Sequence, residues 1–484
     1  MHFNPISSIT DAYSGVSVSG EEMLIQIARR ATILNSMGVG PDTRVLIVHG
    51  GTAEFFQDLF AVWKNGACAL VISPRTTSYE LDNIIQSSFK PVKTVLTNGV
   101  NPGVEHPNVA DFTLDRRCVE GNIRINRNLD DEALILFTSG TTGQPKGVVH
   151  TFRSLFSRTS LNQQFISRTD CRNTLCILPT HFGHGLIGNC LTALAHGNRL
   201  HLMTSPEASN LMKLDETIDK YEINFFSSVP AAWKVVLRYA GEPKKGSIKR
   251  ISVGSAPLSS ELWLEAIRWS GTREVVNMYG ITEAANWICG ASAARFEPED
   301  GLIGNMWGGH AAVLDGDGNV ADSGEGELLV STPALMWGYD GQPELTNSVL
   351  RQGWLHTGDQ GLITKDGMYL TGRLKYQINV AGMKVQPEDI DLLLERHGSV
   401  TEACAFGVEH EISGQVVAVA IVVKGDNEAT REAALGEVKS WSAERFNPDK
   451  LPKRWYLMDE IPKTDRGKVN RSVVADACRN LTGR

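Results

Sequence analysis

The chain lacks the features that mark membrane, secreted and nucleic-acid-binding proteins. It contains no apolar run long enough to cross a bilayer, and its first residues have no basic segment followed by an apolar stretch. Its 55 acidic side chains outnumber the 47 basic ones, for a net charge of -8, whereas binding to a phosphate backbone needs a concentrated basic surface. We therefore expect a cytoplasmic protein without a membrane span or a nucleic-acid partner.

The 8 cysteines do not form a metal or redox pattern. Cys171 and Cys176 are not spaced as C-x-x-C, and no second Cys or His pair stands at the spacing of a zinc site. Several cysteines lie in apolar strings such as residues 67–70, where burial as free thiols is expected. The sequence therefore predicts no structural metal.

Strand and helix patterns alternate over most of the chain. Helical patterns at residues 19–38, 54–64 and 78–88 separate short β-branched runs that have the length of buried strands. The predicted strands are residues 45–48, 68–72, 92–96, 174–178, 199–203, 223–228, 250–253 and 275–278. This alternation favours a largely parallel sheet with helices on both faces.

The pattern changes after about residue 310, where short strands and Gly/Asp turns predict a β-rich subdomain at about residues 311–372. A separate α+β pattern follows Arg373, and it is long enough for a small domain. We predict an α/β fold with a large N-terminal domain, residues 1–374, of parallel and mixed sheets covered by helices, which includes the β-rich subdomain. Residues 375–484 would form a small α+β domain.

The stretch at residues 138–147, Thr-Ser-Gly-Thr-Thr-Gly-Gln-Pro-Lys-Gly, follows the apolar run 133–137 in the manner of a phosphate-binding loop. Its glycines allow close approach of the backbone to an anion, while hydroxyls, amides and Lys146 supply donors and positive charge. The order of residues is not that of the P-loop G-x-x-x-x-G-K-[ST], which disfavours a kinase or P-loop ATPase. A Gly/Ser/Thr-rich surface turn would explain the composition but not the Pro-Lys-Gly ending after a strand. ATP is therefore the first ligand to test.

This stretch resembles the phosphate-binding signature of the adenylate-forming superfamily, which includes acyl-CoA and aryl-CoA synthetases, adenylation domains of peptide synthetases and luciferases. Four further motifs match in the family's order, so the resemblance covers most of the chain. They are Tyr-Gly-Ile-Thr-Glu at 279–283, Trp-Leu-His-Thr-Gly-Asp at 354–359, Gly-Arg-Leu-Lys at 372–375 and Pro-Lys-Thr-Asp-Arg-Gly-Lys at 462–468. The resemblance implies that the C-terminal domain is a mobile lid with its hinge at Lys375.

Acid activation brings two anions together, because a carboxylate attacks the α-phosphorus of ATP while pyrophosphate leaves. The catalyst must neutralise charge and hold the reactants in line. The resemblance implies that Lys468 bridges the α-phosphate and the carboxylate, that Glu283 binds Mg2+ with phosphate oxygens, and that Asp359 holds the ribose. The implied catalytic residues are Lys468, Thr282, Glu283 and His181. The implied ATP-binding residues are Thr138, Ser139, Gly140, Thr141, Thr142, Gly143, Lys146, Gly254, Ser255, Ala256, Tyr279, Gly280, Asp359 and Arg373.

The implied acid pocket consists of His181, Phe182, Val229, Met278, Gly280, Ala285 and Asn286. Whether His181 or His184 gates this pocket is open, because the segment that ends at His181 is one residue shorter than usual. Residues 180–188 contain no acid, and a buried ammonium group without a counter-charge is costly. This disfavours an α-amino acid and favours an aryl or medium-sized organic acid. After the lid rotates, Gly382 would line a tunnel for a thiol.

The resemblance therefore implies an ATP-dependent, AMP-forming ligase that joins a carboxylic acid to CoA, with ATP, Mg2+ and CoA as cofactors. The alternative is a stand-alone adenylating enzyme that passes its acyl group to carrier-protein phosphopantetheine or to an amine. A nucleotide-binding protein that has lost catalysis is disfavoured by the intact Lys468, Glu283 and Asp359. The region before Ser19 is short for a CoA ligase, so a homodimer is left open.

Overall fold

The computed structural model describes most of the chain. The described residues are 6–76, 78–98, 109–111, 128–138, 146–203, 208–373, 376, 378–380, 383–410, 414–446, 450–464 and 468–482. Contacts divide the chain into two compact units, residues 1–311 with 330–356, and residues 312–329 with 357–484. Among the described residues, no helix combines the length and the apolar character that a bilayer crossing demands.

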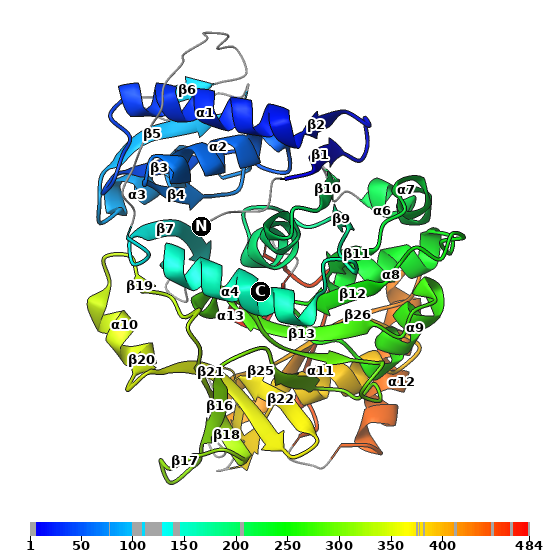
Figure 1. The fold of residues 1–484 in the computed structure, drawn as a ribbon. Helices are drawn as coiled ribbons and strands as arrows, with labels where there is room; N and C mark the ends of the chain where they lie inside the picture. The colour runs from blue at the N-terminus through cyan, green and yellow to red at the C-terminus, as the bar shows by residue number, and fades with distance from the viewer. Residues whose placement is uncertain are drawn as a thin grey trace. The chain divides into compact units, whose positions relative to one another are not determined.

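The first unit contains a 7-stranded sheet in the order β19-β8-β7-β4-β3-β5-β6. The strands are β3 (Arg44–Ile47), β4 (Cys68–Val71), β5 (Val92–Thr97), β6 (Val109–Asp111), β7 (Glu132–Thr138), β8 (Lys146–Thr151) and β19 (Gly338–Tyr339). The strands from β3 to β7 are parallel, whereas β8 and β19 each run antiparallel to their neighbour. Helices α1 (Gly20–Ser36), α2 (Ala53–Lys64) and α3 (Ser78–Ser87) accompany this sheet (Figure 1).

A second sheet of the same unit follows the order β15-β14-β13-β12-β11-β9-β10-β1-β2. The strands are β1 (Ser8–Asp11), β2 (Ser17–Ser19), β9 (Asn173–Cys176), β10 (Arg199–Leu202), β11 (Phe225–Ser228), β12 (Arg250–Gly254), β13 (Val275–Ile281), β14 (Asn286–Ser292) and β15 (Leu302–Met306). The strands from β1 through β13 in this order are parallel, and β14 turns back along β13. The carboxyl ends of β11, β12 and β13 therefore open on the same edge of the sheet.

Helices connect and cover these strands. They are α4 (Phe152–Phe165), α5 (Thr192–Ala195), α6 (Ala208–Leu211), α7 (Leu214–Tyr221), α8 (Pro230–Tyr239), α9 (Ser260–Ser270) and α10 (Pro343–Val349), with a π-helix η1 (His184–Leu191) and a 3-10 turn η2 (Thr282–Ala284). Helix α1 begins where the sequence predicts, because the Ser19 hydroxyl accepts the Glu22 N–H at 3.2 Å. The main core joins α1, α2, α4 and η1 to the 7-stranded sheet through residues such as Phe55, Phe152 and Leu186.

The second unit contains most of an antiparallel group of strands. They are β16 (His310–Leu314), β17 (Val320–Ala321), β18 (Gly324–Ser331), β21 (Trp354–Thr364) and β22 (Gly367–Arg373), and β20 (Leu350–Arg351) of the first unit pairs with the start of β21. Residues 312–329 and 357–373, which the sequence analysis assigned to the large domain, group by contact with the C-terminal residues. Lys375 lies outside the described residues, so the hinge and the boundary after residue 374 stay predictions.

The rest of the second unit is a 5-stranded sheet with three helices, and it confirms the predicted α+β pattern. Its elements are β23 (Ile378–Val380), β24 (Met383–Val385), α11 (Pro387–Glu395), β25 (Val400–His410), β26 (Gly414–Val423), α12 (Glu428–Ala443), β27 (Arg454–Leu457) and α13 (Arg471–Thr482). The predicted α/β fold class is likewise confirmed by the alternation in the first unit.

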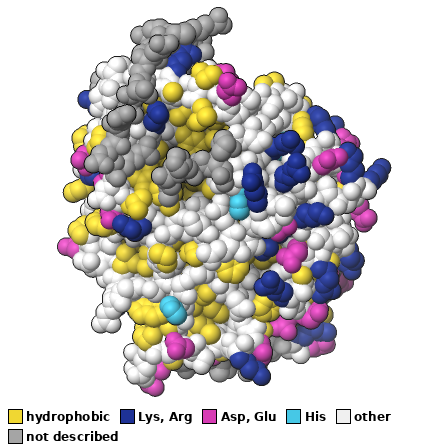
Figure 2. All heavy atoms as spheres, viewed as in Figure 1, with side chains coloured by type: hydrophobic (Ala, Val, Ile, Leu, Met, Phe, Trp, Pro, Cys, Tyr) yellow, Lys and Arg dark blue, Asp and Glu magenta, His cyan; other side chains and the backbone are white. Residues whose placement is uncertain are grey.

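Figure 2 shows hydrophobic side chains gathered on the left of one face of the molecule. Charged side chains of both signs are numerous on the right of that face, and some also lie along its left edge. The cysteines within the described residues are buried free thiols, as predicted.

Candidate functional site

The phosphate-loop motif leaves and re-enters the 7-stranded sheet at adjacent points. Thr138 ends β7 and Lys146 begins β8, and these two residues face each other in the antiparallel register. The pairing closes the base of the loop that carries the predicted donors. Those donors, Ser139, Gly140, Thr141, Thr142 and Gly143, lie outside the described residues, so their roles stay predictions. The Lys146 ammonium lies over the ring of Tyr339, 5.5 Å from its centroid.

Glu283 lies in the 3-10 turn η2, directly after β13. The Tyr339 hydroxyl donates to Glu283 Oε1 at 2.8 Å, and the Met336 N–H donates to the Glu283 carbonyl at 2.7 Å. Glu283 therefore accepts hydrogen bonds at both its side chain and its backbone carbonyl. The structure thus brings Lys146 and Glu283, from two different motifs, onto one tyrosine that the sequence analysis did not identify.

Two buried basic side chains lie against η2. Arg158 of α4 donates from Nε to the Ala284 carbonyl at 3.3 Å, and burial lowers its pKa to about 10. His150 of β8 lies near the Thr282 backbone, and burial lowers its pKa to about 4, so its imidazole is neutral near neutral pH. Arg158 stays charged because its pKa remains well above neutrality. Arg158 is therefore a buried cation in contact with the turn that carries Glu283.

The predicted nucleotide-binding glycines occupy tight points between neighbouring strands. A Cβ on Gly254 would lie 2.7 Å from the Met278 carbonyl oxygen, and one on Gly280 would lie 2.4 Å from the Asn286 carbonyl oxygen. Tyr279 is adjacent in β13 and buried. Both glycines lie at the carboxyl ends of parallel strands, where ligands of α/β sheets bind.

Ser255, directly after β12, has a left-handed backbone with φ of 69°. For a residue with a Cβ this conformation costs on the order of 1–3 kcal/mol, and such strain clusters at functional sites. Its hydroxyl oxygen lies 2.9 Å from His184 Nδ1. Ala256 follows and is exposed. The contact connects the predicted nucleotide segment to the predicted acid pocket.

The two candidate gating histidines have different surroundings. His184 is buried at the start of η1, contacts Ser255, and packs edge-on against Trp287 with ring centroids 5.5 Å apart. His181 is half-buried and packs against Phe182 with centroids 4.1 Å apart. A π-helix is rare and is found frequently at functional sites. The assignment of the gate to one of these residues stays a prediction.

Further predicted pocket residues lie on β13, at the start of β14 and directly after β11. Asn286 has φ of 89° and follows Ala285, with φ of 54°, and a Cβ on Gly188 would lie 2.2 Å from the Asn286 side-chain nitrogen. Met278 packs in one core cluster with Trp287. Val229 precedes α8 at the end of β11. Trp287 lies beside His184, and the sequence analysis missed it. The only signal for it in the sequence was the adjacent residue Asn286, a predicted pocket residue.

In the second unit, Asp359 and Arg373 face each other across β21 and β22. Arg373 Nε lies 2.7 Å from Asp359 Oδ1, and Asp359 is buried. The Asp359 N–H donates to the Thr357 hydroxyl at 3.1 Å. The structure therefore brings together two residues that the resemblance assigned to nucleotide binding, and it supplies the buried carboxylate with a cation.

Lys468 is exposed, and backbone bonds join the residues around it. The Thr464 N–H donates to the Lys468 carbonyl at 2.8 Å, and Lys463 bridges to Val469. Three residues later, Arg471 binds Asp391 Oδ2 at 2.6 Å and Glu388 Oε1 at 3.2 Å, both from α11. The chain directly after Lys468 is thus anchored to α11 of the second unit. Gly382 lies outside the described residues, and its role stays a prediction.

Comparison with known proteins gives consistent matches over nearly the whole chain. Residues 7–340 match the AMP-binding enzyme family, and residues 389–468 match the AMP-binding enzyme C-terminal domain. An oxalate–CoA ligase of Arabidopsis thaliana is 28% identical, over 95% of this chain and 94% of the relative. A fatty acid–[acyl-carrier-protein] ligase, ScoC, of Streptomyces coeruleorubidus is 27% identical, over 96% and 92%. The structure of ATP-bound MatB from Rhodopseudomonas palustris superposes with a TM-score of 0.87 at 23% identity, over 99% and 97% of the two chains.

Proposed function

We propose that this chain, which belongs to the AMP-binding enzyme family, activates a carboxylic acid with ATP and transfers the acyl group to the thiol of CoA. The first step forms a bond between a carboxylate oxygen and the α-phosphorus and breaks the bond to pyrophosphate. In the second step the thiol sulfur attacks the acyl carbon, the thiol proton is lost, and AMP leaves. The assignment of CoA rests on the match to an oxalate–CoA ligase.

The observation that carries the proposal is the meeting of Lys146 and Glu283 on Tyr339. Lys146, a cation from the loop motif, contacts the aromatic ring of Tyr339. Glu283, a carboxylate from the turn motif, contacts the Tyr339 hydroxyl. This is the charge arrangement that a metal–polyphosphate needs, with a cation for phosphate oxygens and a carboxylate for the metal.

The donor set near Glu283 fits Mg2+ that arrives with ATP. Within the described part of the chain, no group of three or more His, Cys, Asp and Glu side chains could hold a metal ion. Mg2+ is usually bound through one or two carboxylates together with substrate phosphates and water. Glu283 can therefore serve as the protein ligand, and the bound ion would neutralise charge on the phosphates.

The residues of the chain then have distinct tasks. Lys146 binds phosphate oxygens, and the buried Arg158 behind η2 adds positive potential where the anions meet. Asp359, oriented by Arg373, accepts hydrogen bonds from the ribose hydroxyls. Lys468 neutralises charge that is shared between the carboxylate and the α-phosphate in the transition state.

For the acid, we propose an aryl or medium-sized organic acid, bound beside His184 and Trp287. The segment 180–188 contributes no carboxylate that could pair with an α-ammonium group. The oxalate–CoA ligase match adds small dicarboxylic acids to the panel that should be tested.

A second acceptor is supported by the match to a fatty acid–[acyl-carrier-protein] ligase, which covers a similar share of this chain. In this alternative the acyl group passes to the phosphopantetheine thiol of a carrier protein. Both readings share the first half-reaction and differ only in the thiol.

Exchange of labelled pyrophosphate into ATP over a panel of acids tests the first half-reaction. We expect exchange that depends on one class of acid and on Mg2+. Release of AMP is then measured with free CoA and with a phosphopantetheinylated carrier protein. Turnover with free CoA supports the ligase, turnover with the carrier protein alone supports the alternative, and absence of exchange with every acid contradicts both.

A further inference from the structure

We propose that Tyr339 is a positioning residue that presents the Glu283 carboxylate to the metal–nucleotide. The inference rests on the proposed function, because it takes Glu283 as the Mg2+ ligand. The Tyr339 side chain contacts Glu283 and Lys146, and it acts through Glu283.

The hydroxyl contact fixes one oxygen of the carboxylate. Tyr339 Oη donates to Glu283 Oε1 at 2.8 Å across 56 positions of sequence. A glutamate side chain has several rotatable bonds, and ordering it costs conformational entropy. A hydrogen bond to Oε1 restricts these rotations and orients the other oxygen. The cost of ordering is then met before the nucleotide binds.

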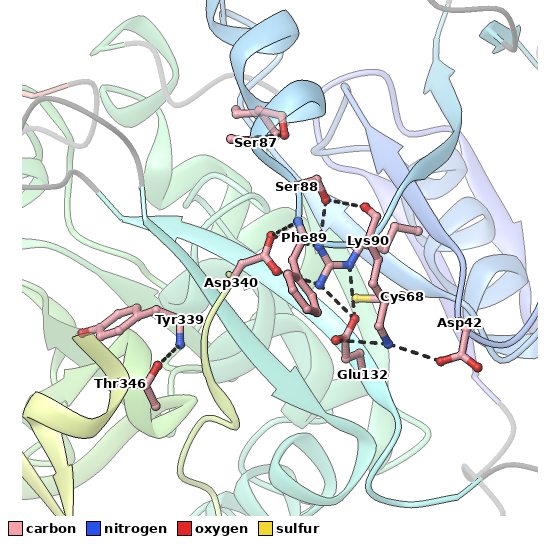
Figure 3. Close-up of polar contacts among 12 residues, drawn as sticks. Asp42, Cys68, Ser87, Ser88, Phe89, Lys90, Glu132, Tyr339, Asp340 and Thr346 are labelled. Carbon is pink, nitrogen blue, oxygen red and sulfur yellow. Dashed lines mark hydrogen bonds and ion pairs between the residues drawn. The ribbon is translucent and has the colours of Figure 1, made fainter. Parts of the chain in front are cut away.

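The backbone around Tyr339 is held at the same place. In β19, Gly338 and Tyr339 pair with Val149 and Val148 of β8. The flanking residues extend the pairing, because the Trp337 N–H donates to the Val149 carbonyl and the Asp340 N–H donates to the Gly147 carbonyl, each at 2.8 Å. The Tyr339 N–H also donates to the Thr346 hydroxyl at 2.9 Å (Figure 3). The backbone at Tyr339 is thus held in a fixed register against β8, the strand that begins at the end of the phosphate-loop motif.

A buried ion pair anchors the next residue. Arg44 Nη2 lies 2.8 Å from Asp340 Oδ1, and Arg44 Nη1 lies 2.9 Å from Asp340 Oδ2. The Phe89 N–H donates to Asp340 Oδ2 at 3.2 Å (Figure 3), and Glu132 also binds Arg44. Arg44 is fully buried. A bidentate pair of this kind fixes direction as well as distance, so the chain at Tyr339 has little freedom to shift.

The ring of Tyr339 has a second partner, since Lys146 Nζ lies 5.5 Å from its centroid. Attraction between an ammonium group and an aromatic face is well established at this distance. The ring therefore holds the loop cation while the hydroxyl holds the carboxylate. Replacing tyrosine with phenylalanine separates the two effects, because it keeps the ring and removes only the hydroxyl.

The test compares Tyr339→Phe with Tyr221→Phe. Tyr221 is a matched control, since its hydroxyl donates to the Ala12 carbonyl at 3.1 Å and Lys220 lies over its ring at 4.8 Å. ATP binding is measured by calorimetry with Mg2+ and again in EDTA, and thermal unfolding is recorded without nucleotide. We expect Tyr339→Phe to weaken MgATP binding roughly tenfold, with unchanged binding in EDTA and a cooperative unfolding transition that shows the variant is folded. Tyr221→Phe should match the wild type in both binding measurements.

A double variant tests whether the hydroxyl acts through the carboxylate. In the Glu283→Gln background, adding Tyr339→Phe should cause no further loss of MgATP affinity. Equal losses with Mg2+ and in EDTA, an additive double variant, or wild-type MgATP binding by Tyr339→Phe would each overturn the inference. Failure of the proposed function differs from these results, because the wild type would then show no acid-dependent pyrophosphate exchange.

Discussion

Replacing Asp340 with alanine tests how far a single buried ion pair supports the first unit. Asp340 accepts two bonds from Arg44 and one from the Phe89 N–H. The Arg44 side chain is 1% exposed and the Asp340 side chain 11% exposed. Alanine would remove the acceptor of one N–H on each of the Arg44 Nη1 and Nη2 atoms, while Nη1 would keep Ser88 Oγ at 2.8 Å and Nη2 would keep Glu132 Oε2 at 3.1 Å.

The expected cost follows from this geometry. Removing one partner of a buried pair costs about 3–5 kcal/mol, because the remaining charge is left in a medium that solvates it poorly. Glu132 still neutralises Arg44, so we expect the lower end, about 3 kcal/mol. For a cooperative unit of this size, such a loss lowers the unfolding midpoint by roughly 4 °C.

Asp42→Asn provides a control in the same network (Figure 3). Asp42 pairs with Lys90 at 3.3 Å, but its side chain is 89% exposed. Solvent screens such a pair, and its loss should cost about 0–1 kcal/mol. Thermal unfolding of the wild type and both variants, followed by tryptophan fluorescence, gives the midpoints. Equal midpoints for Asp340→Ala and Asp42→Asn would refute the reasoning from burial.

The remaining predictions concern catalysis and pH. Lys468→Ala should reduce pyrophosphate exchange roughly 10²–10³-fold without changing the unfolding midpoint. The control Lys453→Ala, at another exposed lysine of the same unit, should leave exchange unchanged. Similar exchange rates for both variants would contradict the role of Lys468. Burial lowers the pKa of His150 to about 4, below its unfolded value of 6.5, so the unfolded state binds more protons between these values and stability falls with decreasing pH. For this fully buried group the loss from pH 7 to pH 4 is about 3 kcal/mol, and midpoints recorded across this range should fall less steeply for His150→Gln than for the wild type.

Much of the architecture was predictable from the sequence because it depends on local patterns. The Ser19 cap, the start of α1 and the β-branched run that became β12 each arise from residues close together in the chain. The motif at 138–147 was recognisable for the same reason, and its ends now lie at β7 and β8. Contacts, however, group residues 312–329 and 357–373 with the C-terminal residues, a long-range property that local periodicity does not report.

The chemical groups of the protein, and the strands and helices that carry them, follow from the order of residues alone, because periodicity, capping and turn residues act within a few positions. The meeting of Tyr339 with Glu283 across 56 positions, and of Arg44 with Asp340 across 296, is visible only in the folded chain. Such contacts depend on the order and register of strands that are distant in the chain. No local pattern encodes that order, since it is selected by the burial of whole sheets and helices against one another.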